Sequence, residues 1–160
     1  MRYSAGTIAL LFCLAGCSAS GPKFQDTPFA TQPVANDKAR IVFYRDSDMN
    51  FRSATIGIDG SIVGAVVHDG FIVADIAPGD HKISAWVRGF PFYEFVIGIP
   101  VEAGKTYYMR VSQRTERVLY PMLGFVGSVL ILADTKGEFQ LELMPKSTAL
   151  QQLKELKLSE

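Results

Sequence analysis

Both cysteines of the 160-residue chain lie near its amino end, in the segment LFCLAGCSAS at residues 11–20. Cys13 and Cys17 are the side chains best suited to chemistry, because thiolates bind soft metals, attack electrophiles and form disulfides. The segment contains no third cysteine and no histidine that would complete a metal site. The residues around the pair therefore decide which chemistry is relevant.

The residues that surround the cysteines have the order of a secretory signal. Met1 and Arg2 give a positive start, residues 7–14 (TIALLFCL) are apolar and uncharged, and two small residues follow. This order predicts a signal peptide over residues 1–16 that is removed from the mature protein. Its apolar core is about half of the roughly 20 residues that a membrane-spanning helix requires. Cys13 leaves with the signal, and the single remaining cysteine cannot form an internal disulfide.

The cleavage site resembles the lipobox of bacterial lipoproteins, and its residues are Leu14, Ala15, Gly16 and Cys17. The resemblance implies diacylglyceryl transfer to the Cys17 sulfur, cleavage before Cys17, and acylation of the freed amine, with palmitate as the expected acyl group. Three chains exceed the two that stable anchoring requires. A plain secretory signal with an incidental cysteine is the alternative. Ser18 stands where Asp would retain such a lipoprotein at the inner membrane, so we expect the periplasmic face of the outer membrane.

The mature chain has the size and charge of one ordinary domain. Removal of residues 1–16 from the 160-residue chain leaves 144 residues. The chain has 16 Lys and Arg against 16 Asp and Glu, so loss of Arg2 leaves a formal charge of −1. This balance argues against nucleic acid or another polyanion as a partner.

Residues 18–37 are rich in Ser, Thr, Pro and Gly and show no periodicity. They predict that residues 17–37 form a lipidated amino end and a flexible tether, and a 20-residue coil spans ~25 Å. Phe24 and Phe29 are unusual in a pure linker. Packing of one or both against the domain is the first interpretation, and a docking role is the second.

After Lys38 the sequence alternates between apolar and polar residues. The clearest runs are at residues 39–45, 83–87, 107–111 and 139–143, each with one apolar face. Asp-Gly and Pro-Gly pairs follow about every ten residues, and an Asp-Gly pair favours a hairpin turn with positive φ at both positions. These patterns predict one all-β domain over residues 38–160, an antiparallel β-sandwich of eight or nine strands.

One short helix is expected at the end of the chain, over residues 147–158. Thr148 and Gln151 have the spacing of a capping box, and leucines follow at helical intervals. Because so short a helix needs tertiary support, we expect it to pack against an open edge or end of the sandwich.

The run IDGSIVGAVVHDGFIVADIAPGDHKISAW lies between an ARIVFYR strand and VEAGKTYYMR. In this order the motifs resemble the bacterial lipoprotein family of domain of unknown function 2846 and, more distantly, the small prealbumin-like β-sandwich modules called PEGA-like. The resemblance covers residues 39–143. It implies a secreted antiparallel β-sandwich with no known catalysis and no known cofactor.

The two histidines of the chain, His68 and His81, adjoin aspartates in predicted turns. Such residues can act as bases or metal ligands, but polar residues in turns are usually only solvated. The sequence contains no G-x-S-x-G elbow, Walker loop or dinucleotide fingerprint. We therefore expect no catalytic, cofactor-binding or metal-binding residues and no enzymatic activity. A hydrolase is the alternative, and it requires a pocket that holds a histidine beside a carboxylate.

Two apolar segments carry the functional signal. In WVRGFPFYEF (residues 86–95), Trp86, Phe90 and Phe92 face outward if the alternate residues face the core, and exposed aromatic rings anchor proteins or stack on sugars. Burial of these rings by a covering element such as the helix is the alternative. Residues 119–132 contain no charge and predict a buried strand pair, with a membrane-dipping or partner-gripping loop as the alternative.

These observations predict a membrane-anchored envelope lipoprotein that acts as a non-catalytic binding module for a protein or glycan, through the surface around Trp86. A structural or assembly subunit of a larger envelope complex is the alternative function. The sequence does not specify the oligomeric state.

Overall fold

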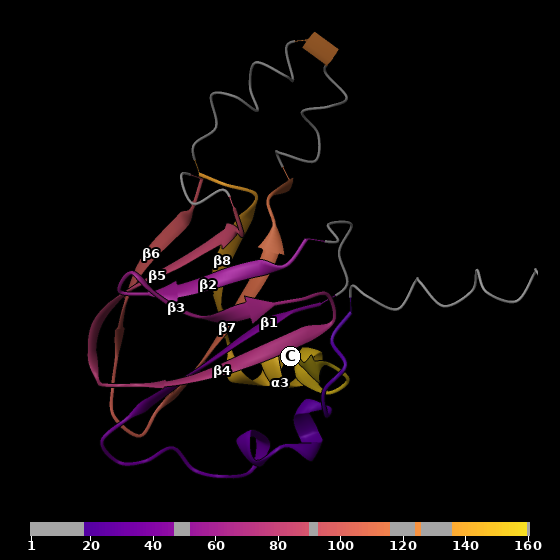
Figure 1. Cartoon of the computed structure of the whole chain (residues 1–160). Helices are drawn as coiled ribbons and strands as arrows, with labels where there is room; N and C mark the ends of the chain where they lie inside the picture. The colour runs from indigo at the N-terminus through magenta and orange to yellow at the C-terminus, as the bar shows by residue number, and fades with distance from the viewer. Residues whose placement is uncertain (1–17, 47–51, 90–92, 116–123, 126–135, 160) are drawn as a thin grey trace, which may run out of the picture.

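The computed structural model describes residues 18–46, 52–89, 93–115, 124–125 and 136–159. Two β-sheets pack face to face in a β-sandwich, and one helix lies near the carboxyl end (Figure 1). The predicted fold class is thereby confirmed.

The first sheet has five strands in the order β8-β7-β1-β4-β9. Their bounds are Phe139–Met144, Thr106–Gln113, Ala39–Arg45, Gly70–Ile76 and Lys157–Leu158. The pairs β1–β7 and β4–β9 are parallel, so this sheet is mixed rather than purely antiparallel as we expected. Parallel neighbours need long crossovers, and the chain supplies them by passing through the second sheet before β7 and through the helix before β9.

The second sheet has four antiparallel strands in the order β3-β2-β5-β6. Their bounds are Ser61–Val66, Ala54–Ile58, Gly79–Val87 and Phe95–Val101. Asp59 and Gly60 join β2 to β3 with φ of 51° and 82°, as the Asp-Gly pair predicts. The register of β2 on β3 shifts between Ile56, which pairs with Gly64, and Gly57, which pairs with Ile62.

The main core fills the space between the sheets. Alternate residues of each strand enter it, which is the period-two pattern seen in the sequence. Its fully buried large side chains are Ile41, Phe43, Ile56, Val66, Ile83, Met109 and Phe139.

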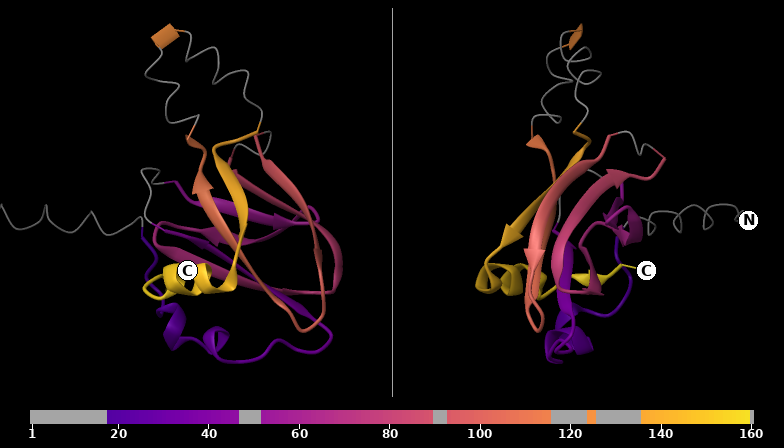
Figure 2. Two further views of the ribbon diagram at one scale, coloured as in Figure 1. Left: turned by 180° about the vertical axis from the view of Figure 1, so that it is seen from behind. Right: turned by 90° about the vertical axis from the view of Figure 1, so that its left-hand side faces the viewer.

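A second apolar cluster covers the outer face of the five-stranded sheet. Helix α3 (Lys146–Leu153) lies on that face (Figure 2) and buries Ala149 and Leu153 against Val42, Tyr44 and Tyr108. Strand β1 is therefore buried on both faces, not on one as its alternation predicts.

The helix differs from its prediction in three respects. It ends at Leu153 rather than at residue 158, because Lys157 and Leu158 form strand β9 beside β4. It begins after Pro145, with no side-chain capping bond, so Thr148 lies inside the helix and the capping box does not form. It also covers a sheet face rather than an edge or end.

The structure corrects the expectation of a flexible tether, because residues 18–37 lie against the sandwich. Two short 3₁₀ turns, η1 (Phe24–Asp26) and η2 (Pro28–Ala30), shape the segment. Phe24 is 4% exposed and meets the Phe71 ring edge-on at 5.2 Å, so the packing interpretation of this residue is confirmed. Burial of the Phe24 side chain outweighs the linker-like composition of this segment.

Arg40 holds the later part of this segment in place. Its guanidinium donates two hydrogen bonds of 2.8 Å to the Asp75 carboxylate and one of 3.2 Å to the Gln32 carbonyl. It also lies over the Phe29 ring, 5.3 Å from the centroid. The hydrogen bond from Arg40 lowers the pKa of Asp75 and keeps this carboxyl charged.

Candidate functional site

The two sheets differ in what covers their outer faces. The outer face of the five-stranded sheet is covered by α3 and by the amino-terminal segment. Among the described residues, no helix or strand lies on the outer face of the four-stranded sheet, and α3 lies on the far side of the molecule from it (Figure 2). This uncovered face is the first candidate for a contact surface.

The uncovered face is apolar and contains small residues at its centre. One row across the strands joins Ile62, Gly57, Ser84 and Val96, and the next joins Ala65, Thr55 and Trp86. We call these seven residues the Trp86 face. Ile62 is 69% exposed and Val96 48% exposed, which is unusual for large aliphatic side chains on one sheet face.

Gly57 lets the indole of Trp86 lie against the sheet. A Cβ atom at Gly57 would be 2.9 Å from the Trp86 ring and 2.8 Å from Ser84 Oγ, closer than any real Cβ contact. Beside them, Thr55 is 4% exposed, and its hydroxyl oxygen has no hydrogen-bond partner among the described residues. The face is thus built around one half-buried aromatic ring and residues small enough to receive it.

Some of the predicted contact residues lie outside the residues that the structure describes. Trp86 is on the outward face, as we expected, and is half-buried. Phe90 and Phe92 lie outside the described residues, as do Cys17 and the cleavage motif at residues 14–16. Of residues 119–132, only Gly124 and Phe125 are described, and Phe125 is 84% exposed.

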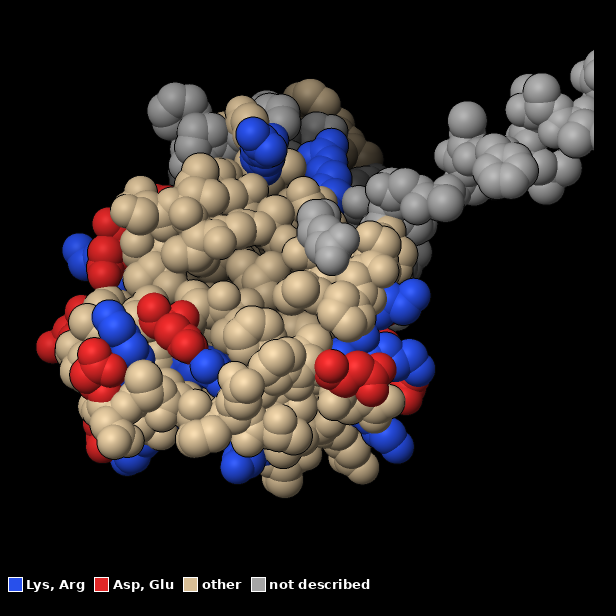
Figure 3. Space-filling view, turned by 60° about the horizontal axis from the view of Figure 1, so that its bottom comes forward, with Lys and Arg blue, Asp and Glu red and all other residues tan. Residues whose placement is uncertain are grey.

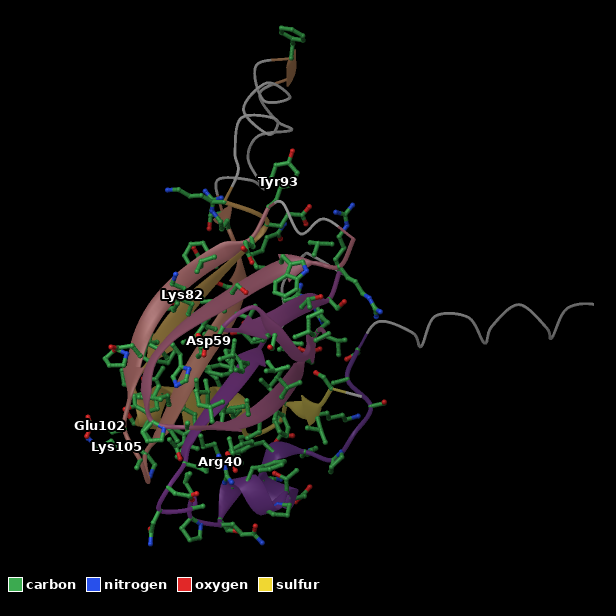
Figure 4. All side chains as sticks on the ribbon, turned by 60° about the vertical axis from the view of Figure 1, so that its left-hand side comes forward. Arg40, Asp59, Lys82, Tyr93, Glu102 and Lys105 are labelled. Carbon is green, nitrogen blue, oxygen red and sulfur yellow. The ribbon has the colours of Figure 1, made fainter. Side chains whose placement is uncertain are left out.

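A second candidate is a shallow hollow of about 430 Å³ at the end of the four-stranded sheet. It is lined by Asp59, Asp80, His81, Lys82, Gly98, Ile99 and Pro100. Figure 4 shows Asp59 and Lys82 close together above the strands. His81 Nδ1 lies 2.6 Å from Asp59 Oδ2, so a histidine and a carboxylate meet in a hollow, as a hydrolase would require.

The contacts of His81 are those of a structural residue rather than of a general base. We call the pair of His81 on β5 and Asp59 in the β2–β3 turn the clasp. His81 Nε2 lies 2.9 Å from the Ala77 carbonyl oxygen, so both ring nitrogens face acceptors and both donate when the ring is charged. The hydrogen bond to Asp59 raises the pKa of His81, and the Lys82 amide together with His81 lowers the pKa of Asp59. No ring nitrogen is left to accept a proton from a substrate, and the residues that line the hollow include no Ser, Thr or Cys.

The clasp predicts a pH-dependent contribution to stability. His81 has a folded pKa above its ordinary 6.5, so its contribution is complete below pH 6.5 and is lost as the pH rises through the raised value. Asp59 has a folded pKa below 3.8, so its contribution is lost only in stronger acid. We expect His81→Gln to lower the melting temperature at pH 5.5 and to have little effect at pH 9.

Calorimetry of the two proteins at both pH values checks this prediction. Asp59→Asn is the matched control, because its side-chain oxygen can still accept from the Lys82 amide while the charge is removed. It should abolish the same pH dependence, and adding it to His81→Gln should cost little more. An equal melting-temperature difference at both pH values would contradict the clasp.

His68 is the other histidine, and it lies near the amino-terminal segment. Its Nδ1 is 3.1 Å from Asp69 Oδ2, and its backbone forms a bridge with Ser18. Within the described ranges, no three His, Cys, Asp or Glu side chains are grouped so that they could hold a metal ion.

On the side shown in Figure 3, charges of both signs lie mainly around the margin and uncharged residues fill the middle.

Comparison with known families identifies the chain. A family model described as protein of unknown function (DUF2846) matches residues 35–121. The chain belongs to the DUF2846 family. The match contains β1 to β7, so every strand of the four-stranded sheet and both candidate sites lie within the DUF2846 region. No curated protein matches the chain.

Of the seven residues of the Trp86 face, the sequence singled out Trp86 alone, and it missed Gly57, Ile62 and Val96 among others. Ile62 and Val96 could have been predicted from the alternation of residues 61–66 and 95–101, which places them on the face opposite to the core. For Gly57 the signal was a glycine inside a strand, which often marks a close approach.

Proposed function

We propose that this DUF2846 protein is a lipoprotein of the bacterial cell envelope, anchored through Cys17, and that its β-sandwich is a non-catalytic interaction module. The observation that carries the proposal is the uncovered Trp86 face, on which large aliphatic side chains stand exposed beside a half-buried indole. Large apolar side chains that stand exposed on one sheet face mark a candidate contact site. The lipobox motif supports the anchor, and no helix in the described ranges is long and apolar enough to cross a membrane.

The chemistry of the Trp86 face favours a protein partner over a glycan. Sugar sites combine an aromatic ring with polar groups that bind the hydroxyls, whereas the hydroxyls of this face are limited to Ser84 and Thr55, both buried. Ile62 and Val96 offer aliphatic contact on either side of small residues. An apolar segment of another envelope protein fits this arrangement, with the indole as the central anchor.

Charge placed on the face should abolish capture of the partner. We expect Ile62→Asp with Val96→Asp to reduce photocrosslinking from a probe at Lys82, an exposed position two residues before Ser84 on β5, by about 30-fold, because hot-spot losses are ~2 kcal/mol or more. The fold should persist, since both side chains are exposed. The measurement is the yield of each crosslinked species in native envelopes.

Leu143→Asp is the matched control, because Leu143 is 51% exposed on β8 of the other sheet. Equal yields from the double variant, the control and the unaltered protein would contradict the proposal. A crosslink to a second copy of the chain would favour the assembly-subunit alternative, and a crosslink to a glycan would replace the protein partner.

The anchor has its own test. We expect the mature protein to begin at Cys17 and to carry a thioether-linked diacylglyceryl group and an amide-linked acyl chain, which intact-mass spectrometry detects. Cys17→Ser should move the protein from the membrane fraction to the soluble fraction, because stable anchoring takes at least two acyl chains and the variant carries none. An unmodified Cys17, or a retained signal, would contradict the anchor.

A further inference from the structure

We propose that the amino-terminal segment holds the sandwich directly against the bilayer, with one defined edge of the domain facing the lipid headgroups. This inference rests on the proposed lipid anchor at Cys17. The membrane-facing edge consists of residues 18–21, the β3–β4 turn at residues 67–69, and β9 with Ser159. The lipid headgroup layer is the partner that this edge contacts.

The segment that follows the anchor is paired to the body from its first described residue. The amide of Ala19 donates to the His68 carbonyl at 3.0 Å. The amides of Gly21 and Phe24 donate to the carbonyls of Leu158 and Leu156 at 3.1 and 2.9 Å. Leu158 in turn donates to the Pro22 carbonyl at 2.9 Å, so the segment extends the five-stranded sheet beyond β9.

Side chains fix the same segment to the body. Phe24 is buried against Phe71 in the cluster beneath α3, and Lys23 forms an ion pair with Glu155. Ala19 is 6% exposed and lies beside Gly70, where an added Cβ would contact the Ala19 side chain at 3.1 Å. Backbone pairing and packing together leave no free chain between Ser18 and η1.

No residue therefore separates the lipid-bearing Cys17 from the body, because Ser18 is already paired with His68. Adjacent Cα atoms are ~3.8 Å apart, so Cys17 lies within that distance of Ser18, whereas a free coil of 20 residues would span ~25 Å. A lipid seated in the bilayer brings the residues beside Ser18 to the headgroup layer. The domain cannot stand off from the membrane while the segment stays docked.

The chemistry of this edge suits a headgroup surface. It presents the hydroxyls of Ser20 and Ser159 and the exposed Lys157 side chain, which can donate hydrogen bonds to phosphate and glycerol oxygens. Two other polar groups of the edge are paired within the protein: Ser18 Oγ donates to the His68 carbonyl at 3.3 Å, and His68 Nδ1 lies 3.1 Å from the Asp69 carboxylate. The large exposed apolar side chains of the described chain belong to other segments: Ile62, Val63, Val96, Phe125, Leu143 and Leu150. The edge thus contacts the surface without inserting into the hydrocarbon.

This arrangement fixes the orientation of the rest of the molecule. Strands β1 and β4 pair Arg45 with Gly70 at the anchored end and Ala39 with Ile76 at the other end. Glu102 and Lys105 lie on the opposite side of the molecule from β9 and the first described residues (Figure 4), so this turn points away from the bilayer. The strands then run away from the membrane surface, and the Trp86 face points parallel to that surface, toward a partner attached to the same membrane.

Fluorescence quenching by labelled lipids tests the orientation. Because Cys13 is removed and the Cys17 sulfur is alkylated, an introduced cysteine is the only free thiol of the lipidated protein. The variants Lys157→Cys and Lys105→Cys carry a donor dye near the anchored edge and at the opposite turn. The protein is reconstituted in phosphatidylethanolamine–phosphatidylglycerol vesicles that contain a headgroup-labelled acceptor. We expect energy transfer at least twofold more efficient from position 157 than from position 105.

An insertion of 20 Gly and Ser residues between Cys17 and Ser18 is the control, because it leaves the docked segment intact and adds ~25 Å of coil. It should lower the transfer from position 157 to near the value at position 105. Equal transfer from both positions without the insertion would overturn the orientation. Mass spectrometry identifies beforehand a protein without lipid on Cys17, which would overturn the proposed anchor as well.

Discussion

Phe24→Ala should lower the free energy of unfolding by about 3 kcal/mol, the usual cost of removing a buried phenylalanine side chain. Phe24 is 4% exposed and contacts Phe71 in the cluster beneath α3, so the substitution leaves a cavity where the amino-terminal segment meets the sheet. Urea denaturation measures the loss. Limited trypsin digestion should cut the variant at Lys23 before the body unfolds, because that segment is then held by fewer contacts.

Phe29→Ala is the matched control from the same segment. Phe29 is only half-buried and lies over the Arg40 guanidinium, so we expect a loss of about 1 kcal/mol. A Phe24→Ala protein within ~0.5 kcal/mol of the unaltered protein, with Lys23 still protected from trypsin, would show that the segment is not docked through this residue.

Gly137→Ala should be similarly damaging, with a loss of about 3 kcal/mol. Gly137 has a φ of 79°, which an alanine adopts only with strain. An added methyl group would also overlap the backbone carbonyl of Tyr93, in the connection between β5 and β6. Figure 4 shows Tyr93 at the end of the sandwich opposite the Arg40 region. Thermal denaturation measures the effect, and crosslinking from the probe at Lys82 should fall as well, because this contact supports the strands that carry Trp86 and Val96.

Gly104→Ala is the control that separates backbone strain from steric overlap of the added methyl group. Gly104 has a φ of 74°, close to that of Gly137, but nothing lies within 4 Å of an added Cβ atom. We expect it to cost ~1 kcal/mol, the strain of the left-handed conformation alone. Equal losses from the two substitutions would contradict the contact between Gly137 and Tyr93.

Local patterns predicted most of the sheet structure. Alternation in ARIVFYR and TYYMRVS marks strands because side-chain direction has a period of two, and the Asp59-Gly60 pair marks a turn because few other residues accept its φ angles. These features depend on neighbours in sequence, so they were accessible without a structure.

The features that define the candidate sites depend on distant residues. The composition of residues 18–37 suggests a coil, but their docking depends on Leu156 and Leu158 at the other end of the chain. The helix ends early because β9 pairs with β4, which no local pattern indicates. Whether Trp86 is covered depends on which sheet receives α3, and apolar periodicity in a helix does not specify its partner.

The pairing of the first and last parts of the body has a consequence for biogenesis. Lys23 contacts Glu155 across 132 residues, and among the described residues the segment 18–24 forms its long-range backbone hydrogen bonds with the β3–β4 turn and with residues 156–158. Under the proposed secretion through a signal peptide, the amino end would emerge first, and Gly21 and Phe24 would have no backbone partners until Leu156 and Leu158 had followed. On that proposal, residues 20–24 would remain accessible to processing enzymes during export, and their docking on the carboxyl-terminal residues would be the last step of maturation.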